Sequence, residues 1–439
     1  MDRRLFGTDG VRGIAGVEIT AQLALALGRA AVLHSGLSAP RALLIRDTRE
    51  SGDMLEAALA AGLSSAGAEV ALGGVLPTPA APVLVRRHGF DLAAVISASH
   101  NPYTDNGIKF FGGDGFKLSD ETEHEIETHI DEDVGGGGQR IGRIEAMPGG
   151  AEDYLHALQE RFGDLSLDGL DVALDCANGA TSDVAPAMFR RLGARVTALS
   201  ASPDGRNIND GCGSTHVQAL GAAVREGGHD VGFAFDGDGD RVLAVDRDGA
   251  IVDGDELLAL AALHLQEQGR LVGGGLVVTV MTNFGFHTAM AAAGIEVVST
   301  AVGDRYVLAE LRERGWTLGG EQSGHIIEMG FAPTGDGIAS ALLALEALGG
   351  RDLRDRAAME KLPQRLVNVP VRDRTALAGA TAVHEAVARE VAALDGRGRV
   401  LVRPSGTEPL VRVMVEAPSE AETEAVCARL VAVVEDLLG

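Results

Sequence analysis

The feature that most constrains the fold is an alternation of short apolar runs with segments of helical periodicity. In the first hundred residues, three apolar runs of strand length are separated by two segments that repeat apolar residues at helical spacing. This alternation is typical of βαβ units, in which helices cover the faces of a parallel sheet. We predict strands at 42–45, 69–72 and 93–96, and helices at 54–65 and 78–87.

The same alternation restarts three times, near residues 172, 276 and 366. A glycine-rich and acidic segment, 131–150, precedes the first restart and indicates a domain boundary. The last block differs, because two strand-like runs flank a short loop before an amphipathic helix at 419–438. We predict three α/β domains with mixed, largely parallel sheets, plus a smaller α+β C-terminal domain, around a central cleft. The predicted domains span residues 1–150, 151–255, 256–365 and 366–439.

Composition excludes two classes of partner. The 439 residues include 38 Lys+Arg against 63 Asp+Glu, a formal net charge of −25. Non-specific nucleic-acid binders and proteins of anionic membrane surfaces need a basic face, so neither class fits. The three cysteines form no CxxC pair, and neither a signal-peptide core nor a membrane-length apolar run is present. We therefore expect a cytoplasmic protein without nucleic-acid or membrane partners, and leave open whether it is a monomer or a homodimer.

The loop after the third apolar run carries a candidate nucleophile. It reads Ser-Ala-Ser-His-Asn-Pro at the carboxyl end of a predicted strand, where open α/β sheets place their sites. Ser99 would present its hydroxyl on a tight bend beside His100. The alternative for so short a motif is an ordinary polar loop. Lys109 follows Ser99 in the same region. Because nearly all cations of this chain are arginines and only three are lysines, a lysine here indicates a group that can give up a proton, which arginine cannot. Lys117 is expected at the surface.

Three aspartates at alternate positions suggest a metal site. Asp236, Asp238 and Asp240 follow an apolar run and are separated by glycines, so their carboxylates can converge from one side of the chain. Three hard oxygen ligands and a phosphate oxygen suit magnesium. An EF-hand is excluded because its sixth and twelfth positions, normally Gly and Glu, are Arg241 and Arg247 here. A solvated acidic turn is the weaker reading, since three unpaired carboxylates would repel one another.

Two further glycine-containing loops offer groups to a ligand. Glu321 and Ser323 lie two residues apart between glycines, where both can face a ligand and accept hydrogen bonds from sugar hydroxyls. The segment 403–409, Arg-Pro-Ser-Gly-Thr-Glu-Pro, with Arg412 beyond it, offers amides, hydroxyls and arginines to a phosphate, and a hairpin turn is its alternative. Smaller clusters place more cations in candidate cleft loops: Arg12, Arg46, Arg49, Arg241 and Arg305.

These loops are complementary in what they offer. The Ser99 loop offers a serine that can carry a phosphoryl group, and the aspartate loop can bind a metal that balances the phosphoryl charge. The Glu321 loop offers a sugar-binding pair, and the segment 403–409 offers a separate anion site. An enzyme needs both a phosphoryl carrier and a second phosphate site when its substrate already bears a phosphate. This combination is expected of a phosphosugar mutase.

The order of the motifs carries a resemblance to a known family. SASHNP, DGDGDR, GGEQSGH and RPSGTEPLVRV resemble the motifs of the α-D-phosphohexomutase superfamily over essentially the whole chain. Within it, FGTDGVRG, NINDGCGSTH, MTNFG and EQSGH are similar to the bacterial phosphoglucosamine mutase family. That family interconverts glucosamine 6-phosphate and glucosamine 1-phosphate on the way to UDP-N-acetylglucosamine and the cell wall. The resemblance implies a phosphoserine enzyme and a hexosamine bisphosphate that serves as intermediate and activator.

Roles for single residues follow from the resemblance by motif position. Ser99 resembles the phosphoserine, and its phosphate would join the three aspartates around one Mg²⁺ per subunit. Arg12 or Arg241 would balance the charge of the moving phosphoryl group, and we take Lys109 and then His325 as candidates for proton transfer. The substrate-binding residues implied are Arg241, Gly303, Asp304, Glu321, Ser323, Arg403, Ser405, Gly406, Thr407 and Arg412.

Two alternatives remain. A related mutase that acts on glucose or mannose phosphates would share all of this chemistry. A sugar-phosphate binder without catalysis belongs to a different class, but such a protein would be expected to have lost Ser99 or one of the three aspartates, and all four are present.

Overall fold

The computed structural model describes residues 5–7, 9–130, 140–405 and 408–439. The chain forms two compact units: unit 1 comprises Met1–Val280 and Glu296–Arg356, and unit 2 comprises Met281–Ile295 and Ala357–Gly439. Gly406, Thr407 and part of the predicted boundary segment 131–150 lie outside the described residues.

The first sheet of unit 1 has six strands in the order β1-β5-β4-β2-β3-β6. Strands β2, β3, β4 and β6 run parallel, whereas β5 pairs antiparallel with both β4 and β1. Helices α1 and α2 pack closely because each presents a glycine, Gly28 and Gly62, where a Cβ would collide with the backbone of the other helix. The elements are β1 Val11–Ile14, α1 Ala21–Ser35, β2 Arg41–Arg46, α2 Gly52–Ser65, β3 Glu69–Val75, α3 Ala80–His88, β4 Leu92–Ile96, β5 Asp105–Gly112, α4 Asp120–Ile130 and β6 Ile144–Ala146.

The second sheet of unit 1 has five strands in the order β11-β10-β9-β7-β8, with β7 parallel to both β8 and β9 and the other pairs antiparallel. Strand β9 is buried along its whole length, as expected for a central strand covered on both faces. The elements are α5 Gly150–Phe162, β7 Asp171–Asp175, α6 Val184–Arg191, β8 Arg195–Leu199, α7 Gln218–Gly227, β9 Val231–Phe235, β10 Val242–Asp246 and β11 Ile251–Val252.

The third sheet of unit 1 has four strands in the order β13-β12-β14-β15, of which only the β14–β15 pair is antiparallel. Helix α8 begins with a complete capping box, in which Asp253 accepts from the Glu256 N–H and the Glu256 side chain accepts in return. The elements are α8 Gly254–Glu267, β12 Gly275–Thr279, β13 Glu296–Thr300, α10 Asp304–Arg314, β14 Leu318–Gly320, β15 Ile326–Glu328 and α11 Gly337–Leu348, with short 3₁₀ helices at Val272–Gly274 and Leu353–Asp355.

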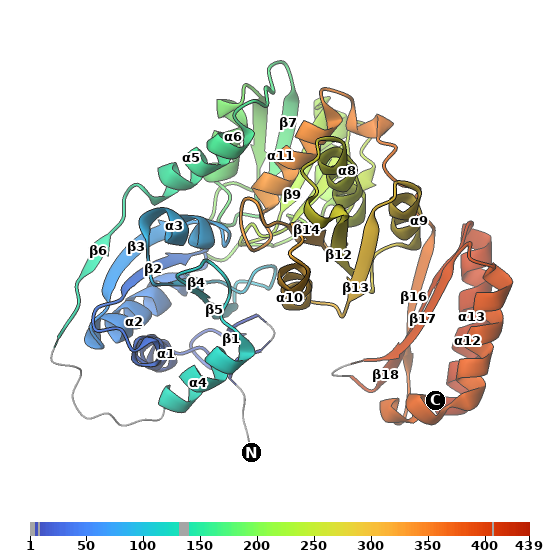
Figure 1. Cartoon of the computed structure of the whole chain (residues 1–439), viewed down its shortest axis with the longest axis horizontal. Coiled ribbons are helices and arrows are strands. Elements are labelled where there is room, and N and C mark those ends of the chain that lie inside the picture. Colours follow the sequence, from blue (N-terminus) through green and yellow to red (C-terminus); the bar gives the residue numbers. More distant parts are fainter. Residues whose placement is uncertain (1–4, 8, 131–139, 406–407) are drawn as a thin grey trace. The chain divides into compact units, whose positions relative to one another are not determined.

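Unit 2 contains an antiparallel three-stranded sheet in the order β16-β18-β17, and helix α13 packs against it (Figure 1). The segment Met281–Ile295 belongs to this unit because Asn283 donates to the Leu362 carbonyl (3.0 Å), Phe284 N–H donates to Glu416 (3.1 Å), and Arg399 donates to the Thr282 carbonyl (2.8 Å). Its elements are α9 Phe284–Ala292, β16 Gln364–Pro370, α12 Thr381–Leu394, β17 Arg399–Pro404, β18 Leu410–Glu416 and α13 Glu420–Leu438, with a 3₁₀ helix at Arg374–Gly379.

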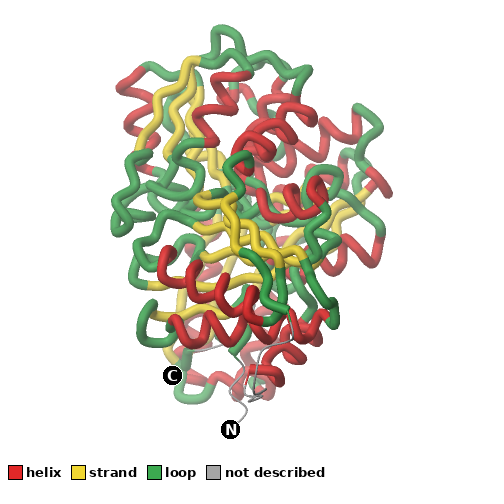
Figure 2. The backbone as a smooth tube through the Cα atoms, turned by 90° about the vertical axis from the view of Figure 1, so that its left-hand side faces the viewer, coloured by secondary structure: helices red, strands yellow, loops and turns green. Residues whose placement is uncertain are grey.

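The predicted fold class is confirmed: the sheets of unit 1 are mixed and largely parallel, and the C-terminal sheet is smaller and antiparallel. Figure 2 shows strands of these sheets with helices beside them. The boundaries predicted at residues 150, 255 and 365 stay a prediction. Among the described residues, the helices fall short of the length and apolar character that a membrane crossing requires.

Candidate active site

The predicted nucleophile lies at the carboxyl end of a buried strand. Ser99 follows β4 and is 1% exposed, and its φ of 50° places it in the left-handed region. Its N–H donates to Ser97 Oγ (2.9 Å), which in turn donates to Asp47 Oδ2 (2.6 Å). The Ser99 hydroxyl donates to Asp236 Oδ2 (2.6 Å) and lies 3.2 Å from His100 Nδ1. A left-handed serine is unfavourable by about 1–2 kcal/mol, so this geometry needs such supporting contacts.

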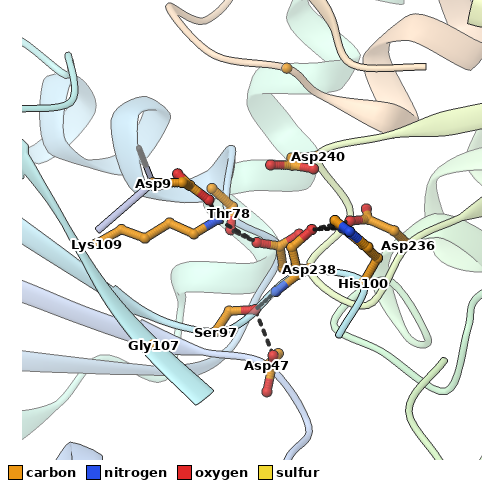
Figure 3. A network of polar contacts seen from close by, with 12 residues as sticks. Asp9, Asp47, Thr78, Ser97, His100, Gly107, Lys109, Asp236, Asp238 and Asp240 are labelled. Carbon is orange, nitrogen blue, oxygen red and sulfur yellow. Dashed lines mark hydrogen bonds and ion pairs between the residues drawn. The ribbon is translucent and has the colours of Figure 1, made fainter. Parts of the chain in front are cut away.

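The three predicted metal ligands converge immediately after strand β9. Asp236, Asp238 and Asp240 are all buried, and each offers a carboxylate oxygen within 4.8 Å of the others (Figure 3). Asp238 Oδ2 accepts from Thr78 Oγ1 (2.7 Å) and from Lys109 Nζ (2.9 Å). Among the described residues, Asp238 Oδ1 and Asp240 Oδ1 have no hydrogen-bond partner.

These carboxylates fit a divalent cation. Burial together with the neighbouring Asp240 and Asp238 raises the pKa of Asp236 well above its ordinary value. Two buried oxygens without a partner and a carboxyl destabilised by its neighbours are the arrangement that a hard cation with oxygen ligands would relieve. The observed cluster is therefore compatible with metal binding.

Lys109 and Arg12 are brought to this cluster by two neighbouring strands. Lys109 lies on β5, and Arg12 on β1 pairs with Gly107 of β5. Lys109 Nζ lies 2.9 Å from both Asp238 Oδ2 and Asp9 Oδ2 (Figure 3), and Arg12 also contacts Asp9. Burial lowers the pKa of Lys109, but Asp238 and Asp9 overcome this and raise it. The ammonium form is favoured, so Lys109 carries a proton and a positive charge beside Asp238.

Lys117 was expected at the surface, and that expectation is wrong. Its side chain is 13% exposed and pairs with Asp9 (2.6 Å) and with Asp304. Burial would raise the pKa of Asp9, but Lys109, Lys117 and Arg12 hold it well below its ordinary value. The sequence pattern could not reveal this bridge, because Lys117 and Asp304 are separated by 187 residues along the chain.

His325 lies between two of these carboxylates. Its Nδ1 is 3.6 Å from Asp240 Oδ2, and its Nε2 is 3.9 Å from Asp304 Oδ2. Burial lowers the pKa of His325, whereas Asp240 and Asp304 raise it, and the net direction is upward. The Gly335 N–H donates to Nε2 (3.0 Å), so in the neutral ring Nε2 is the acceptor and Nδ1 carries the hydrogen that points toward Asp240.

The loop predicted to bind sugar contacts a second predicted substrate-binding segment, Gly303 and Asp304. Glu321 follows β14 and is 8% exposed, and its Oε1 accepts from the Gly303 N–H (3.0 Å) at the start of α10. Ser323 lies two residues further along, in the turn before β15. Arg241, which precedes β10, places its Nε 3.8 Å from Asp240 Oδ1, and this Nε makes no hydrogen bond to any described residue. Asp304, at the start of α10, pairs with Lys117, and its role in substrate binding stays a prediction.

The predicted phosphate-binding residues that are described lie in unit 2. Arg403 on β17 stands opposite Arg412 on β18, and we call these two residues the arginine pair. Partial burial and the charge of Arg412 lower the pKa of Arg403. Arg412 Nε has no partner among the described residues, although the guanidinium lies 3.7 Å from Glu408. Ser405 is buried between the two strands, and its carbonyl accepts from Arg374 (2.8 Å), a cation that the sequence analysis missed. Like charges opposite each other suit an anion.

Three arginines expected in cleft loops serve other contacts. Arg46 pairs with Asp53 and Glu56 of α2, and Arg305 pairs with Asp120 and Glu123 around α4. Arg49 is 1% exposed and pairs with Asp47 (2.9 Å). Its guanidinium also donates to the carbonyls of Ser99 (2.9 Å), Asn101 (2.9 Å) and Pro102. Arg49 therefore supports the serine loop instead of facing a ligand.

Comparison with known proteins places this fold and site in a class. Four domain families match in order along the chain: phosphoglucomutase/phosphomannomutase alpha/beta/alpha domain I at residues 3–134, domain II at 152–249, domain III at 253–366 and the C-terminal domain at 366–433. A solved phosphoglucomutase/phosphomannomutase family protein from Burkholderia thailandensis matches with a TM-score of 0.82 at 24% identity, over 99% of this chain and 98% of that chain. The fold is that of the phosphohexomutases.

Sequence relatives narrow the class. A phosphoglucosamine mutase of Desulforudis audaxviator is 52% identical over 99% of this chain and 98% of its own length. One from Saccharopolyspora erythraea is 52% identical over 97% of this chain and 98% of its own length. The chain belongs to the phosphoglucosamine mutase family. A solved N-acetylphosphoglucosamine mutase of Aspergillus fumigatus, in complex with GlcNAc-6P and magnesium, shares the fold with a TM-score of 0.70 at 18% identity, over 98% of this chain and 95% of that chain.

Proposed function

We propose that the chain catalyses the reversible conversion of glucosamine 6-phosphate to glucosamine 1-phosphate through a phosphorylated Ser99. The observation that carries the proposal is the buried Ser99 hydroxyl 2.6 Å from Asp236 Oδ2, at the edge of the three-aspartate cluster. Relatives that are 52% identical over nearly the whole chain are phosphoglucosamine mutases, which supports the same reaction.

The reaction consists of two phosphoryl transfers. Phosphorylated Ser99 gives its phosphoryl group to the C1 oxygen of glucosamine 6-phosphate, which produces glucosamine 1,6-bisphosphate and the free serine. The bisphosphate turns over, and Ser99 takes the phosphoryl group from C6, which leaves glucosamine 1-phosphate and restores the phosphoserine. Each transfer needs an in-line approach and balanced charge more than covalent help, so positioning dominates the catalysis.

Charged residues around Ser99 have distinct roles in this scheme. Asp236, Asp238 and Asp240 would hold one Mg²⁺, which, when bound, neutralises the phosphate charge that develops during transfer. Lys109, held as an ammonium by Asp238 and Asp9, would supply a proton near the serine oxygen. Arg12 and Arg241 would stabilise the equatorial oxygens of the moving group, and His325 is the second candidate for proton transfer.

Substrate binding is divided between the sugar and the phosphate that does not react. Glu321, Ser323 and Gly303 would bind the sugar hydroxyls, with Asp304 at the same loop. The non-reacting phosphate would be held by the arginine pair and by Ser405, with Gly406 and Thr407 completing that loop. The opposed guanidinium groups of Arg403 and Arg412 support this assignment, because an anion removes their repulsion.

The product, glucosamine 1-phosphate, is the substrate of further reactions. We infer that glucosamine 1-phosphate is consumed by acetyl and uridylyl transfer to UDP-N-acetylglucosamine, which feeds peptidoglycan synthesis in the cytoplasm. The pathway context of the family supports this inference. The glucosamine bisphosphate would serve as activator as well as intermediate.

One experiment tests the reaction and its substrate together. Purified enzyme, supplied with Mg²⁺ and a hexose 1,6-bisphosphate activator, is assayed with glucosamine 6-phosphate, glucose 6-phosphate and mannose 6-phosphate. We expect kcat/KM to be highest for glucosamine 6-phosphate. Ser99→Ala should lose turnover and the phosphorylated species in an intact-mass spectrum.

Two results would contradict the proposal. A higher kcat/KM for glucose or mannose 6-phosphate would assign the chain to the related mutase activity. Turnover or an added phosphate that survives in Ser99→Ala would remove Ser99 as the phosphoryl carrier.

A further inference from the structure

The stretch Asn-Ile-Asn-Asp-Gly-Cys-Gly-Ser, residues 207–214, has no role in the proposed reaction, although it contributes to the family resemblance. It is an irregular segment between β8 and α7 that contacts the ends of β7 and β9, two neighbouring strands of the second sheet. Gly213 N–H donates to Asp175 at the end of β7 (2.8 Å), and Ser214 N–H donates to the carbonyl of Phe235 (2.8 Å), the residue before Asp236. The segment is thus fixed to the base of the metal loop.

From this segment, one side chain reaches the serine loop. Asn209 is 7% exposed, and its Nδ2 donates to the carbonyl of Ser99 (2.9 Å) and to the carbonyl of Asn101 (3.2 Å). Its own N–H donates to the Ala177 carbonyl (2.9 Å), and its φ of 60° is left-handed. The backbone of Asn209 is thus fixed by the Ala177 carbonyl, and its side-chain amide donates to two carbonyls of a loop about 110 residues away in the chain.

The metal loop packs against the same contact. A Cβ placed on Gly237 would lie 2.7 Å from Asn209 Nδ2 and 2.7 Å from the Ser99 carbonyl oxygen. The absence of a side chain at Gly237 therefore lets the metal loop, the Asn209 amide and the serine loop meet at one point. Any shift of the serine loop relative to Asp236 has to break this contact.

We propose that Asn209 is a positioning residue that fixes the left-handed Ser99 and sets the place of its hydroxyl relative to the three aspartates. This role rests on the proposed function, since it matters only if Ser99 carries the phosphoryl group. Arg49 donates to the same carbonyls from the serine loop's own sheet, whereas Asn209 donates from the sheet that carries the metal loop. Asn209 thus joins the nucleophile to its metal ligands.

Arg49 is unsuitable for a test, because its removal would leave Asp47 as a buried, uncompensated charge and unfold the protein. Asn209→Gly keeps the left-handed backbone accessible and removes only the amide. Asn209→Asp keeps the size of the side chain and faces the two carbonyls with an acceptor. Asn178→Gly is the matched control: Asn178 is also left-handed, with φ 47°, and its side chain bonds to Asn207 and Ser202 but not to the serine loop.

The experiment measures kcat, KM, the rate at which glucose 1,6-bisphosphate phosphorylates Ser99 by intact mass, and thermal unfolding of the full chain. For Asn209→Gly we expect kcat and the phosphorylation rate to fall together by about 10- to 100-fold, as for an ångström-scale misplacement of a reacting group. KM should stay within about twofold, because Asn209 is assigned no contact with the substrate. Asn209→Asp should lower kcat and the phosphorylation rate at least as much. Asn178→Gly should keep kcat within about twofold of the wild type.

The outcomes separate this inference from the proposed function. A wild-type enzyme without mutase activity or Ser99 phosphorylation would overturn both. An active wild type with an equally active Asn209→Gly or Asn209→Asp would overturn the positioning role alone. The role would also be wrong if Asn178→Gly lost kcat to the same extent, because the effect would then be a general loosening of the segment. If Asn209→Gly does not fold, Asn209→Asp decides by the same criteria.

Discussion

The candidate-site cations of unit 1 and unit 2 differ in their charged neighbours. In unit 1, Lys109 and Lys117 are largely buried, and each lies within hydrogen-bond distance of two carboxylates. In unit 2, Arg403 and Arg412 stand opposite each other on neighbouring strands and are partly exposed. The two lysines near Ser99 are thus charge-paired before substrate binds, whereas the arginine pair is left with a repulsion that a bound anion would remove. The difference separates a centre arranged for chemistry from one arranged for binding.

The largest effect is expected for a substitution that removes both a carboxylate partner of Lys109 and a predicted metal ligand. In Asp238→Asn, Lys109 loses one of its two carboxylate partners and the metal site loses one of three ligands. We expect kcat to fall about 10³-fold and the Mg²⁺ concentration for half-maximal activity to rise about 10- to 100-fold. Asp248→Asn, an exposed aspartate in the turn after β10, is the control and should leave both values unchanged. An unaltered Mg²⁺ titration in Asp238→Asn would exclude it as a ligand.

The second effect concerns stability rather than chemistry. Lys117→Met removes the cation shared by Asp9 and Asp304 and leaves both as buried carboxylates short of a partner. We expect the free energy of unfolding of unit 1 to fall by about 3–5 kcal/mol. The single tryptophan of the chain, Trp316, is buried in unit 1, so its fluorescence in urea reports this unit. Lys117→Arg keeps the charge and should recover part of the loss; a Met variant as stable as the wild type would contradict the bridge.

The third effect concerns binding by unit 2 rather than stability. Arg403→Met keeps an unbranched side chain but removes the repulsion with Arg412, so we expect no loss of stability of unit 2 by calorimetry. KM for glucosamine 6-phosphate should rise about 10- to 100-fold with a smaller change in kcat, because uniform binding energy is lost. Arg429→Met removes an exposed arginine paired with Glu390 in the same unit and should leave KM unchanged. A normal KM in Arg403→Met would remove the arginine pair from phosphate binding.

The parts of the site that could be predicted from the sequence are those that are local in the chain. The three aspartates lie within five residues, so their spacing alone brings the carboxylates together. The serine at a strand's carboxyl end follows from the βαβ pattern, and the opposition of Arg403 and Arg412 follows from two strands joined by a short loop.

The parts that could not be predicted depend on contacts between distant segments. Ser99 and Asp236 are 137 residues apart, and no local pattern encodes their hydrogen bond. Lys117 was predicted at the surface because the sequence around it is polar. Its two partners, Asp9 and Asp304, are far from Lys117 and from each other in the sequence. Arg49 was placed among the cations of the candidate cleft loops for a similar reason, since a sequence shows the charge of a side chain but not the carbonyls that it contacts.

The smallest effect tests a buried carboxyl of unit 1 whose partners are neutral. Asp336 caps helix α11 by accepting from the Ala339 N–H (2.9 Å) and also accepts from the Tyr154 hydroxyl (2.9 Å). Burial raises the pKa of Asp336 to about 7 despite these two hydrogen bonds. The ordinary pKa in an unfolded chain is about 3.9, so the folded state binds this proton more tightly. Its contribution to stability is complete below pH 4 and is lost as the pH rises toward and through 7.

Asp336→Asn keeps a side chain that caps helices well and cannot titrate. Between pH 5 and 6 we expect the wild type to lose about 1.4 kcal/mol of unfolding free energy relative to this variant. Urea titrations followed by Trp316 fluorescence across pH 4.5–7.5 measure the difference directly. Tyr154→Phe is the matched control, because it removes the neutral hydrogen bond but leaves Asp336 titratable. Parallel stability curves for the wild type and Asp336→Asn would mean that Asp336 is already ionised across this range, and that helix α11 and the surrounding dipoles stabilise its charge as effectively as the lysines stabilise the carboxylates near Ser99.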